Sequence, residues 1–269
     1  MKLTAEQENV IELAKTGESL KVQARAGCGK TSVLIAAANQ LSGRGHYIAF
    51  NKSIADEAGR KFGGNVAAKT AHSMAYAVKG RSLADRLKTR LTGRMVAERF
   101  ALRDMQITRD QSLSAISQGY IVIDMINLFT QGGDSNVDVN HANYNSFIVK
   151  EGDDNHVNKI KKTVFDEMLP VARSLWADLS NPYGTLPITH DTYLKLWALD
   201  NPTINSDFIL FDEAQDASGV MLDILRNQQA QVILVGDDKQ QIYSWRGATN
   251  AMQRMQTANT AQMTLSFRF

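Results

Sequence analysis

The chain has 269 residues, of which 43% are hydrophobic and 22% charged, a composition typical of a folded domain with a substantial core rather than of a disordered chain. Its net charge of +2 means that any nucleic-acid site must be a local patch. No apolar run approaches the roughly 20 residues of a membrane span, and glutamates interrupt the N-terminal segment where a signal peptide would be apolar. A single cysteine, Cys28, excludes an internal disulfide framework, so we expect a cytoplasmic protein, or a nuclear one in a eukaryote.

Short helices and strands alternate over the first 75 residues. Thr4 followed by Gln7 is typical of a capping box that opens a helix running to about residue 14. The elements expected after it are a strand at 20–24, a helix following the glycine turn at 27–29, a strand at 46–50, a helix at 53–62 and a strand at 66–68. This alternation favours an α/β fold with a mostly parallel sheet covered by helices.

The middle of the chain changes character and is mainly helical by pattern, for example at 83–101 and 164–179. Two polar stretches, 131–145 and 151–162, are expected to be exposed loops. The strand pattern then resumes with FILF at 208–211, followed by a helix near 220–226 and VILVG at 232–236. We therefore expect one α/β domain that is interrupted by an inserted, mainly helical subdomain.

The segment ARAGCGKT, from Ala24 to Thr31, lies between an expected strand and an expected helix. Glycines allow backbone N–H groups to turn toward a phosphate chain, Lys30 would neutralise the β- and γ-phosphates, and the hydroxyl of Thr31 would bind Mg²⁺. The strict phosphate-loop pattern has glycine where Ala24 stands. The alternative is an ordinary glycine turn with an exposed lysine, and Cys28 is expected to be a spacer in the loop.

Two adjacent carboxylates, Asp212 and Glu213, follow the strand FILF. Open α/β sheets bind their ligands at the carboxyl ends of the strands. One carboxylate could hold Mg²⁺ through water while the other orients and deprotonates an attacking water. Taken alone, such a pair is usually a solvated turn, so its interpretation depends on the phosphate loop.

A third cluster, GDDKQQIYSWRGA at 236–248, follows the next strand. Gln240 could contact a γ-phosphate. Tyr243 and Trp245 offer stacking faces and Arg246 a phosphate-binding cation, which are the components of a single-strand site. The alternative is that both aromatic residues belong to the core.

Together these motifs resemble superfamily 1 helicases of the UvrD/Rep type, and most closely the F-box DNA helicase branch with its bacterial and phage relatives. The matching segments are LTAEQ at 3–7, ARAGCGKTS at 24–32, AFNKS at 49–53, TAHS at 70–73, ITHDTYLKLWAL at 188–199, FDEAQD at 211–216, GDDKQQIYSWRGA at 236–248 and TLSFRF at 264–269. They occur in the family's order and span almost the whole chain.

The resemblance implies a site for ATP and Mg²⁺. The residues expected to bind the nucleotide are Gln7, Ala26, Gly27, Cys28, Gly29, Lys30, Thr31, Ser32, Phe267 and Arg268. Gln7 would read the adenine edge, a role compatible with helix capping, Phe267 would stack on the adenine and Arg268 would touch the γ-phosphate. Asp212 would hold Mg²⁺ together with Thr31.

The resemblance also implies roles in catalysis and in DNA binding. Glu213 would be the catalytic base, and Gln240 would link the state of the γ-phosphate to the DNA site. The candidates for contacts with single-stranded DNA are Asn51, His72, Tyr243, Trp245 and Arg246. Two positions depart from the family pattern, because Ala49 and Ala71 stand where aromatic residues are usual.

At the level of domains, the resemblance implies that 1–80 and 200–269 form the RecA-like ATP-binding domain 1A, and that 81–199 form the inserted subdomain 1B. The second RecA-like domain, which carries the family's arginine finger, would follow Phe269. We therefore expect the ATP-binding half of a monomeric, ATP-dependent DNA helicase that moves 3′→5′ on single-stranded DNA in repair or recombination. The chain by itself is expected to bind ATP–Mg²⁺, to hydrolyse it weakly and not to unwind a duplex.

Two further hypotheses stay open on the sequence. A nucleotide switch without motor activity would bind ATP and present the inserted subdomain to a protein partner, and single-stranded DNA would not affect it. A single-strand-binding module would carry a vestigial phosphate loop. The intact set of Lys30, Thr31, Asp212 and Glu213 argues against the vestigial loop.

Overall fold

A computed structural model describes residues 3–150, 152–240 and 251–267 of the chain. The chain divides into two compact units. Unit 1 comprises the segments 1–75 and 197–269, and unit 2 comprises the intervening segment, Tyr76–Leu196.

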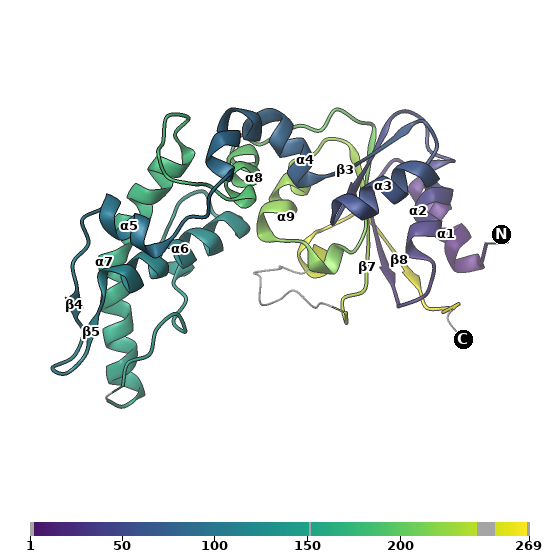
Figure 1. Ribbon diagram of the computed structural model, residues 1–269. Helices are drawn as coiled ribbons and strands as arrows, with labels where there is room; N and C mark the ends of the chain where they lie inside the picture. The colour runs from purple at the N-terminus through teal and green to yellow at the C-terminus, as the bar shows by residue number, and fades with distance from the viewer. Residues whose placement is uncertain (1–2, 151, 241–250, 268–269) are drawn as a thin grey trace. The chain divides into compact units, whose positions relative to one another are not determined.

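Unit 1 is built on a six-stranded sheet in the order β3-β2-β6-β7-β1-β8, in which every described pairing is parallel (Figure 1). Its strands are β1 (Leu20–Ala24), β2 (Gly45–Ala49), β3 (Val66–Thr70), β6 (Phe208–Phe211), β7 (Gln231–Gly236) and β8 (Asn259–Met263). The order places β6 and β7 between β2 and β1. Gly45 pairs with Phe208 and Leu20 with Ile233, so residues 163 and 213 positions apart in the chain are neighbours in the centre of the sheet.

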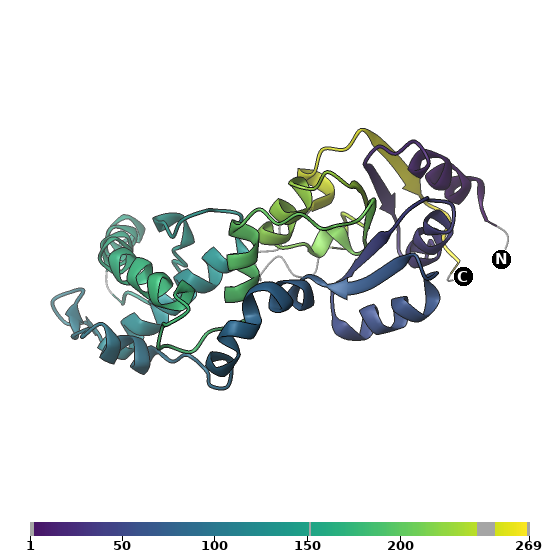
Figure 2. The same ribbon diagram turned by 90° about the horizontal axis from the view of Figure 1, so that it is seen from above.

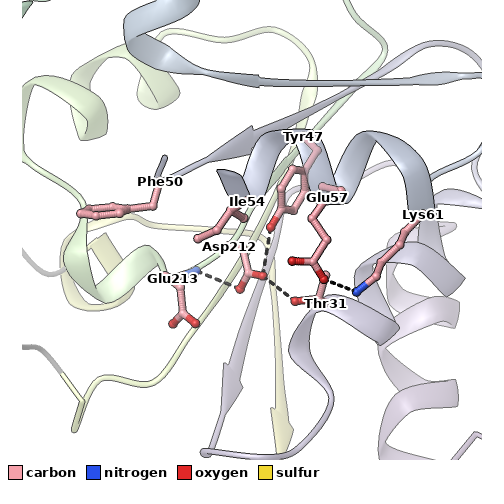
Figure 3. A pocket seen from close by; sticks show the side chains of 9 residues that line it. Thr31, Tyr47, Phe50, Ile54, Glu57, Lys61, Asp212 and Glu213 are labelled. Carbon is pink, nitrogen blue, oxygen red and sulfur yellow. Dashed lines mark hydrogen bonds and ion pairs between the residues drawn. The ribbon is translucent and has the colours of Figure 1, made fainter. Parts of the chain in front are cut away.

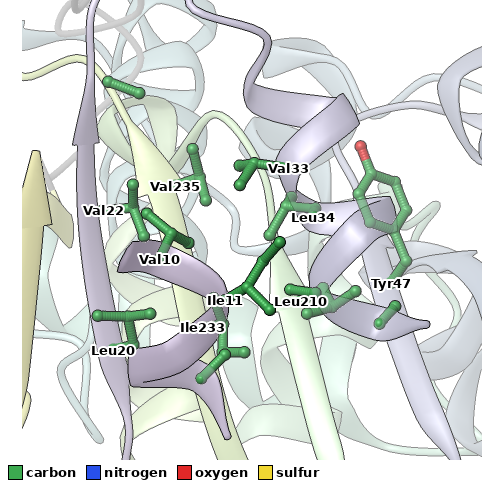
Figure 4. Close-up of a cluster of buried hydrophobic side chains, with 14 of the residues drawn as sticks. Val10, Ile11, Leu20, Val22, Val33, Leu34, Tyr47, Leu210, Ile233 and Val235 are labelled. Carbon is green, nitrogen blue, oxygen red and sulfur yellow. The ribbon is translucent and has the colours of Figure 1, made fainter. Parts of the chain in front are cut away.

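Helices cover both faces of this sheet. The helices of unit 1 are α1 (Ala5–Ala14), α2 (Lys30–Ala38), α3 (Lys52–Lys61), α4 (Ala71–Ala75), α9 (Gly219–Arg226) and α10 (Ala251–Arg254), with a short η4 turn (Ala214–Asp216). Side chains from α1, α2 and α3 pack on one face against residues such as Leu210, Ile233 and Val235 (Figure 4). Ile209 and Leu234, of the opposite parity in their strands, are also fully buried, as expected for a parallel sheet covered on both sides. Helices α9 and α10 lie on that second side (Figures 1 and 2).

Unit 2 is mainly helical. Its elements are η1 (Tyr76–Gly80), η2 (Arg81–Leu87), α5 (Gly93–Arg99), the two-residue strands β4 (Met105–Gln106) and β5 (Ser112–Leu113), α6 (Ala115–Gln131), η3 (Val139–His141), α7 (Asp154–Ser180) and most of α8 (His190–Leu199). Apolar residues of α6 and α7, among them Met125, Phe129 and Phe165, form its core. Helix α7 is the longest described, and no helix in the described part of the chain is both long and apolar enough to cross a bilayer.

The expected α/β class with a parallel sheet is confirmed, and so is the capping box of the first helix. The Gln7 backbone N–H donates to Thr4 Oγ1 over 3.2 Å, and the Thr4 N–H donates to Gln7 Oε1 over 3.1 Å. The sequence did not predict strand β8. Its residues, NTAQM, have few of the β-branched and aromatic side chains that predict a strand.

Three expectations for the middle of the chain were wrong in detail. The polar stretch 151–162 is mostly the start of α7, because the carboxylate of Asp153 caps the helix by accepting from the His156 N–H. The stretch 131–145 buries Val137 and His141. The helix expected over 83–101 is two shorter pieces, η2 and α5, and the second begins at a new cap, Thr92.

Candidate functional site

The phosphate loop joins β1 to α2 and has the backbone form that an anion site requires. Gly27 and Gly29 have φ values of 77° and 75°, in the left-handed region that glycine adopts without strain. Gly29 is the N-cap of α2 and offers no side chain to cap the helix. The positive end of the α2 dipole and its first N–H groups therefore lie at this loop, as in sites that hold phosphate. Ala26 is half-buried in the loop and Ser32 is exposed in the first turn of α2.

Two side chains of this loop meet the two carboxylates that follow β6. Lys30 Nζ lies 2.5 Å from Glu213 Oε2. The hydroxyl of Thr31 donates to Asp212 Oδ2 over 3.0 Å. The fold thus brings together four residues from segments about 180 positions apart, because β6 ends at the same edge of the sheet as β1.

Asp212 is the more deeply buried of the two carboxylates, with 8% of its surface exposed. Burial, reinforced by the neighbouring charge of Glu213, raises the pKa of Asp212 above its ordinary value. Hydrogen bonds from Thr31 and from the Glu213 N–H oppose that rise. A buried carboxylate beside a second carboxylate and a hydroxyl offers the hard oxygen ligands that Mg²⁺ prefers, and a bound cation would offset the burial. These residues fit the implied metal ion.

Glu213 has a backbone conformation that is rare for a residue with a side chain, with φ 51° and ψ 43°. Such a conformation costs about 1–3 kcal/mol and is typical of functional sites. Gln215 fixes the side chain from the other direction, because its Nε2 donates to Glu213 Oε2 over 2.8 Å. The Oε1 atom of Gln215 accepts the Asp237 N–H over 3.0 Å, which connects Glu213 to the end of β7.

A small pocket of about 190 Å³ opens beside these residues (Figure 3). It is lined by Thr31, Tyr47, Phe50, Ile54, Glu57, Ala58, Lys61, Asp212 and Glu213. Tyr47 points into the site from β2, and its hydroxyl donates to Asp212 Oδ2 over 3.2 Å. Lys61 forms an ion pair with Glu57 at the exposed side of the pocket.

The adenine side of the expected site is formed around Gln7. Its Nε2 donates to the Cys28 carbonyl over 3.2 Å, while its Oε1 serves the helix cap. A primary amide has two N–H groups and an oxygen with two lone pairs, so the bonds among the described residues use one donor and one acceptor position and leave one of each. The Phe267 N–H donates to the Gly27 carbonyl over 3.0 Å, and the ring of Phe267, 46% exposed, lies beside the loop.

Cys28 is more than a spacer, which corrects the sequence expectation. Its side chain is 1% exposed and belongs to the apolar core of unit 1. Cys28 therefore serves to pack the core, and its burial also raises the pKa of the thiol.

Two of the residues expected to contact DNA, Asn51 and His72, are described, and so is Gln240, which was expected to link the γ-phosphate to the DNA site. Asn51 is exposed and caps α3, accepting the Ile54 N–H over 2.9 Å. His72 is half-buried on α4, and Gln240 is exposed in the turn after β7, where its N–H donates to the Asp237 carbonyl. Tyr243, Trp245, Arg246 and Arg268 lie outside the described residues.

Sequence reasoning missed Tyr47 and Gln215. Gln215 is part of the FDEAQD segment, so its position in a recognised motif could have singled it out. Tyr47 could have been noticed as the one residue with a hydroxyl in the strand HYIAF, since a buried phenol usually has a hydrogen-bond partner.

Comparison with known proteins places the chain in a family. Residues 65–259, well over half of the chain, match the family model for the UvrD/REP helicase N-terminal domain. The chain is similar to F-box DNA helicase 1 of Gallus gallus, with 32% identity over 100% of this chain and 26% of the relative. It is similar to F-box DNA helicase protein 1 of Schizosaccharomyces pombe, with 32% identity over 99% of this chain and 31% of the relative. It therefore spans between a quarter and a third of these relatives, and the chain belongs to the UvrD/REP helicase family through that family's N-terminal domain.

Proposed function

We propose that the chain is the ATP-binding part of an ATP-dependent DNA motor that moves on single-stranded DNA. The observation that carries the proposal is the meeting of Lys30 with Glu213 and of Thr31 with Asp212 at one edge of the sheet. If Asp212 and Glu213 were only a solvated turn after β6, neither would be expected to pair with a residue of the phosphate loop. Lys30 is only 12% exposed, which argues against an ordinary glycine turn with a free lysine.

In this proposal each residue has a task that follows from its surroundings. The N–H groups at the start of α2 and the ammonium group of Lys30 bind the phosphates of ATP. Thr31 and Asp212 hold Mg²⁺, which would neutralise charge developing on the phosphates. Glu213 pairs with Lys30. If Lys30 turns to the phosphates, Glu213 becomes available to orient and deprotonate a water.

Gln7 and Phe267 are proposed to bind the adenine. The free donor and acceptor of the Gln7 amide match the two groups on the Watson–Crick edge of adenine. The exposed ring of Phe267 offers a stacking face beside Gly27 and Gly29. The site would therefore favour ATP over GTP.

We also propose that unit 1 corresponds to the domain called 1A and unit 2 to the subdomain called 1B, and that translocation runs 3′→5′. The direction rests on the family alone. Residues 1–269, studied without any further domain, are expected to turn over ATP slowly, because the family's arginine finger comes from a second RecA-like domain and contributes about 10³–10⁵-fold.

Nucleotide binding and turnover test the proposal. The 269-residue chain should bind a fluorescent ADP analogue more tightly with Mg²⁺ than without it, and Lys30→Ala should weaken that binding roughly 100-fold. ATP hydrolysis should be slow and should rise when the chain is extended through a following α/β domain and supplied with single-stranded DNA. Unchanged nucleotide affinity in Lys30→Ala would contradict the assigned phosphate site. Nucleotide binding with no response to DNA in the extended protein would contradict the motor and favour a switch.

A further inference from the structure

We propose that Tyr47 is a positioning residue. Its hydroxyl holds the carboxylate of Asp212, the proposed metal ligand, in place at the edge of the sheet. The inference rests on the proposed function, because it assigns Asp212 to Mg²⁺. Tyr47 is not part of any motif that pointed to the site, and it acts through Asp212 rather than on the nucleotide.

The geometry follows from the strand order. Strand β2 pairs with β6 in parallel, with Tyr47 opposite Leu210, two residues before Asp212. The Tyr47 side chain extends toward the carboxyl end of the sheet, and its hydroxyl donates to Asp212 Oδ2 over 3.2 Å (Figure 3). The ring is fully buried and packs against Phe62, with the ring centroids 5.0 Å apart. A rigid strand and a packed ring thus fix the position of this donor.

Three groups in the described part of the chain donate to Asp212, and they come from different parts of the site. The Glu213 N–H donates to Oδ1 over 2.9 Å, and the hydroxyls of Thr31 and Tyr47 both donate to Oδ2. Thr31 belongs to the phosphate loop and is itself an expected metal ligand. Tyr47 is the donor that comes from the interior of the sheet, so it can keep the carboxylate oriented while the ligands around it change.

The phenol is suited to this task because its hydroxyl can donate to Asp212 Oδ2, and an ionised carboxylate can only accept. A phenylalanine would fill the same space against Phe62. What the hydroxyl adds is therefore a hydrogen bond to a buried carboxylate.

Tyr47→Phe tests the inference, with binding of a fluorescent ADP analogue as the readout at increasing Mg²⁺. We expect the Mg²⁺ concentration at half-maximal enhancement to rise roughly 10-fold, as is typical when a residue that orients a metal ligand is removed. Affinity measured without Mg²⁺ should change less than about 2-fold, since Tyr47 acts through Asp212. A wild-type Mg²⁺ dependence in Tyr47→Phe would overturn the inference.

Tyr193→Phe is the matched control. Tyr193 is a buried tyrosine of unit 2 whose hydroxyl hydrogen-bonds His190 over 2.8 Å. Tyr193→Phe should lose about as much stability as Tyr47→Phe but keep the wild-type response to Mg²⁺. The control therefore separates the general cost of deleting a buried hydroxyl from an effect on the metal site.

A double-mutant cycle with Asp212→Asn adds a second criterion. If Tyr47 acts through Asp212, then Tyr47→Phe changes nothing further in the Asp212→Asn background, whereas additive losses would overturn the inference. The inference can also fail separately from the proposed function. Wild-type protein that binds nucleotide through Lys30 and responds to Mg²⁺ supports the function whatever Tyr47→Phe does, and wild-type protein that binds no nucleotide overturns both.

Discussion

Both units bury polar side chains, but the partners of those side chains differ. In unit 1 the buried polar residues are Gln7, Asp212, Gln215 and Asp237, and all of them lie around the phosphate loop and the ends of β6 and β7. In unit 2 they are Gln118, Thr130, His141, Thr192 and Lys195. Most of the latter bind backbone carbonyls, as Lys195 does at Gly132 and Asp134 over 2.7 and 2.6 Å.

The difference separates groups that are available to a ligand from groups that hold a chain in place. Lys195 also lies over the ring of Phe129, 4.5 Å from its centroid, and so is enclosed on several sides. Lys30, by contrast, has one carboxylate partner among the described residues, and that partner, Glu213, has a strained backbone. A buried lysine by itself therefore indicates no site, whereas one whose partner belongs to another motif does. Four variants test this contrast.

Lys195→Met should have the largest effect. It removes a charged donor from two backbone carbonyls in a buried setting, and we expect unit 2 to lose roughly 3–4 kcal/mol in free energy of unfolding. Denaturant titration with a helical signal measures the loss, and the exposed Lys159→Met serves as control. Nucleotide affinity of the folded protein should stay unchanged, and a change would mean that the two sets of polar residues are coupled.

Lys30→Ala should show the opposite behaviour. We expect nucleotide affinity to fall roughly 100-fold, about 2.7 kcal/mol, because a charge-assisted contact with the phosphates is lost. The free energy of unfolding should change little. Calorimetric titration measures the affinity, and Lys61→Ala, at the exposed rim of the pocket, should bind as the wild type does. Equal losses of nucleotide affinity in Lys30→Ala and Lys61→Ala would show that Lys30 has no special role in binding.

Gln7→Ala sharpens the comparison within unit 1, because Gln7 has both a structural and a proposed functional role. We expect a loss of about 1–1.5 kcal/mol in stability, since the capping box and the bond to the Cys28 carbonyl both disappear. Preference for ATP over GTP should fall as well. Thr4→Ala loses only the cap, and its nucleotide preference should therefore match that of the wild type. If both variants lost the preference, the effect would come from capping.

Glu6 gives the smallest effect and one that depends on pH. Its carboxylate accepts from the Thr264 hydroxyl over 2.6 Å and from the N–H groups of Thr264 and Leu265, which lowers the pKa of Glu6. A lowered folded-state pKa means that the stabilisation is complete above the ordinary glutamate value of about 4.3 and is lost as the pH falls through the folded value.

Glu6 is partly exposed, so we expect Glu6→Gln to cost only roughly 0.5 kcal/mol at pH 7. The difference from wild type in thermal unfolding should shrink as the pH falls below the ordinary glutamate pKa of about 4.3 and should disappear below the lowered pKa of folded Glu6. A difference that grew on acidification would contradict the assigned contacts.

The sequence was most informative where local pattern and final contacts coincide. The strand FILF, the helix after the phosphate loop and the capping box of Thr4 and Gln7 were all predictable, because each depends on periodicity or on residues three positions apart. Strand β8 was not, since its partner β1 rather than its own composition makes it a strand. The α7 start was missed because the charged first turns of a long helix resemble a loop in composition.

The site divides in the same way. Recognisable sequence motifs contain four of the site residues, Lys30, Thr31, Asp212 and Glu213. These residues meet because the parallel strands β1 and β6 end at the same edge of the sheet. Gln215 and Tyr47 depend on tertiary geometry, because nothing near Tyr47 in the sequence says that its hydroxyl reaches a carboxylate 165 positions away. Residues that orient other residues are hard to find from sequence for this reason.

The strand order also has a consequence for biosynthesis. Strand β1 has β7 and β8 as its neighbours, and more than 200 residues separate it from β7. At about 5–20 residues per second, a ribosome would need on the order of 10–40 s to make that stretch. During this interval both edges of β1 lack the strands that later cover them, and the phosphate loop has no carboxylates to meet. The early chain is thus a segment that chaperones or neighbouring nascent chains could engage before the sheet closes.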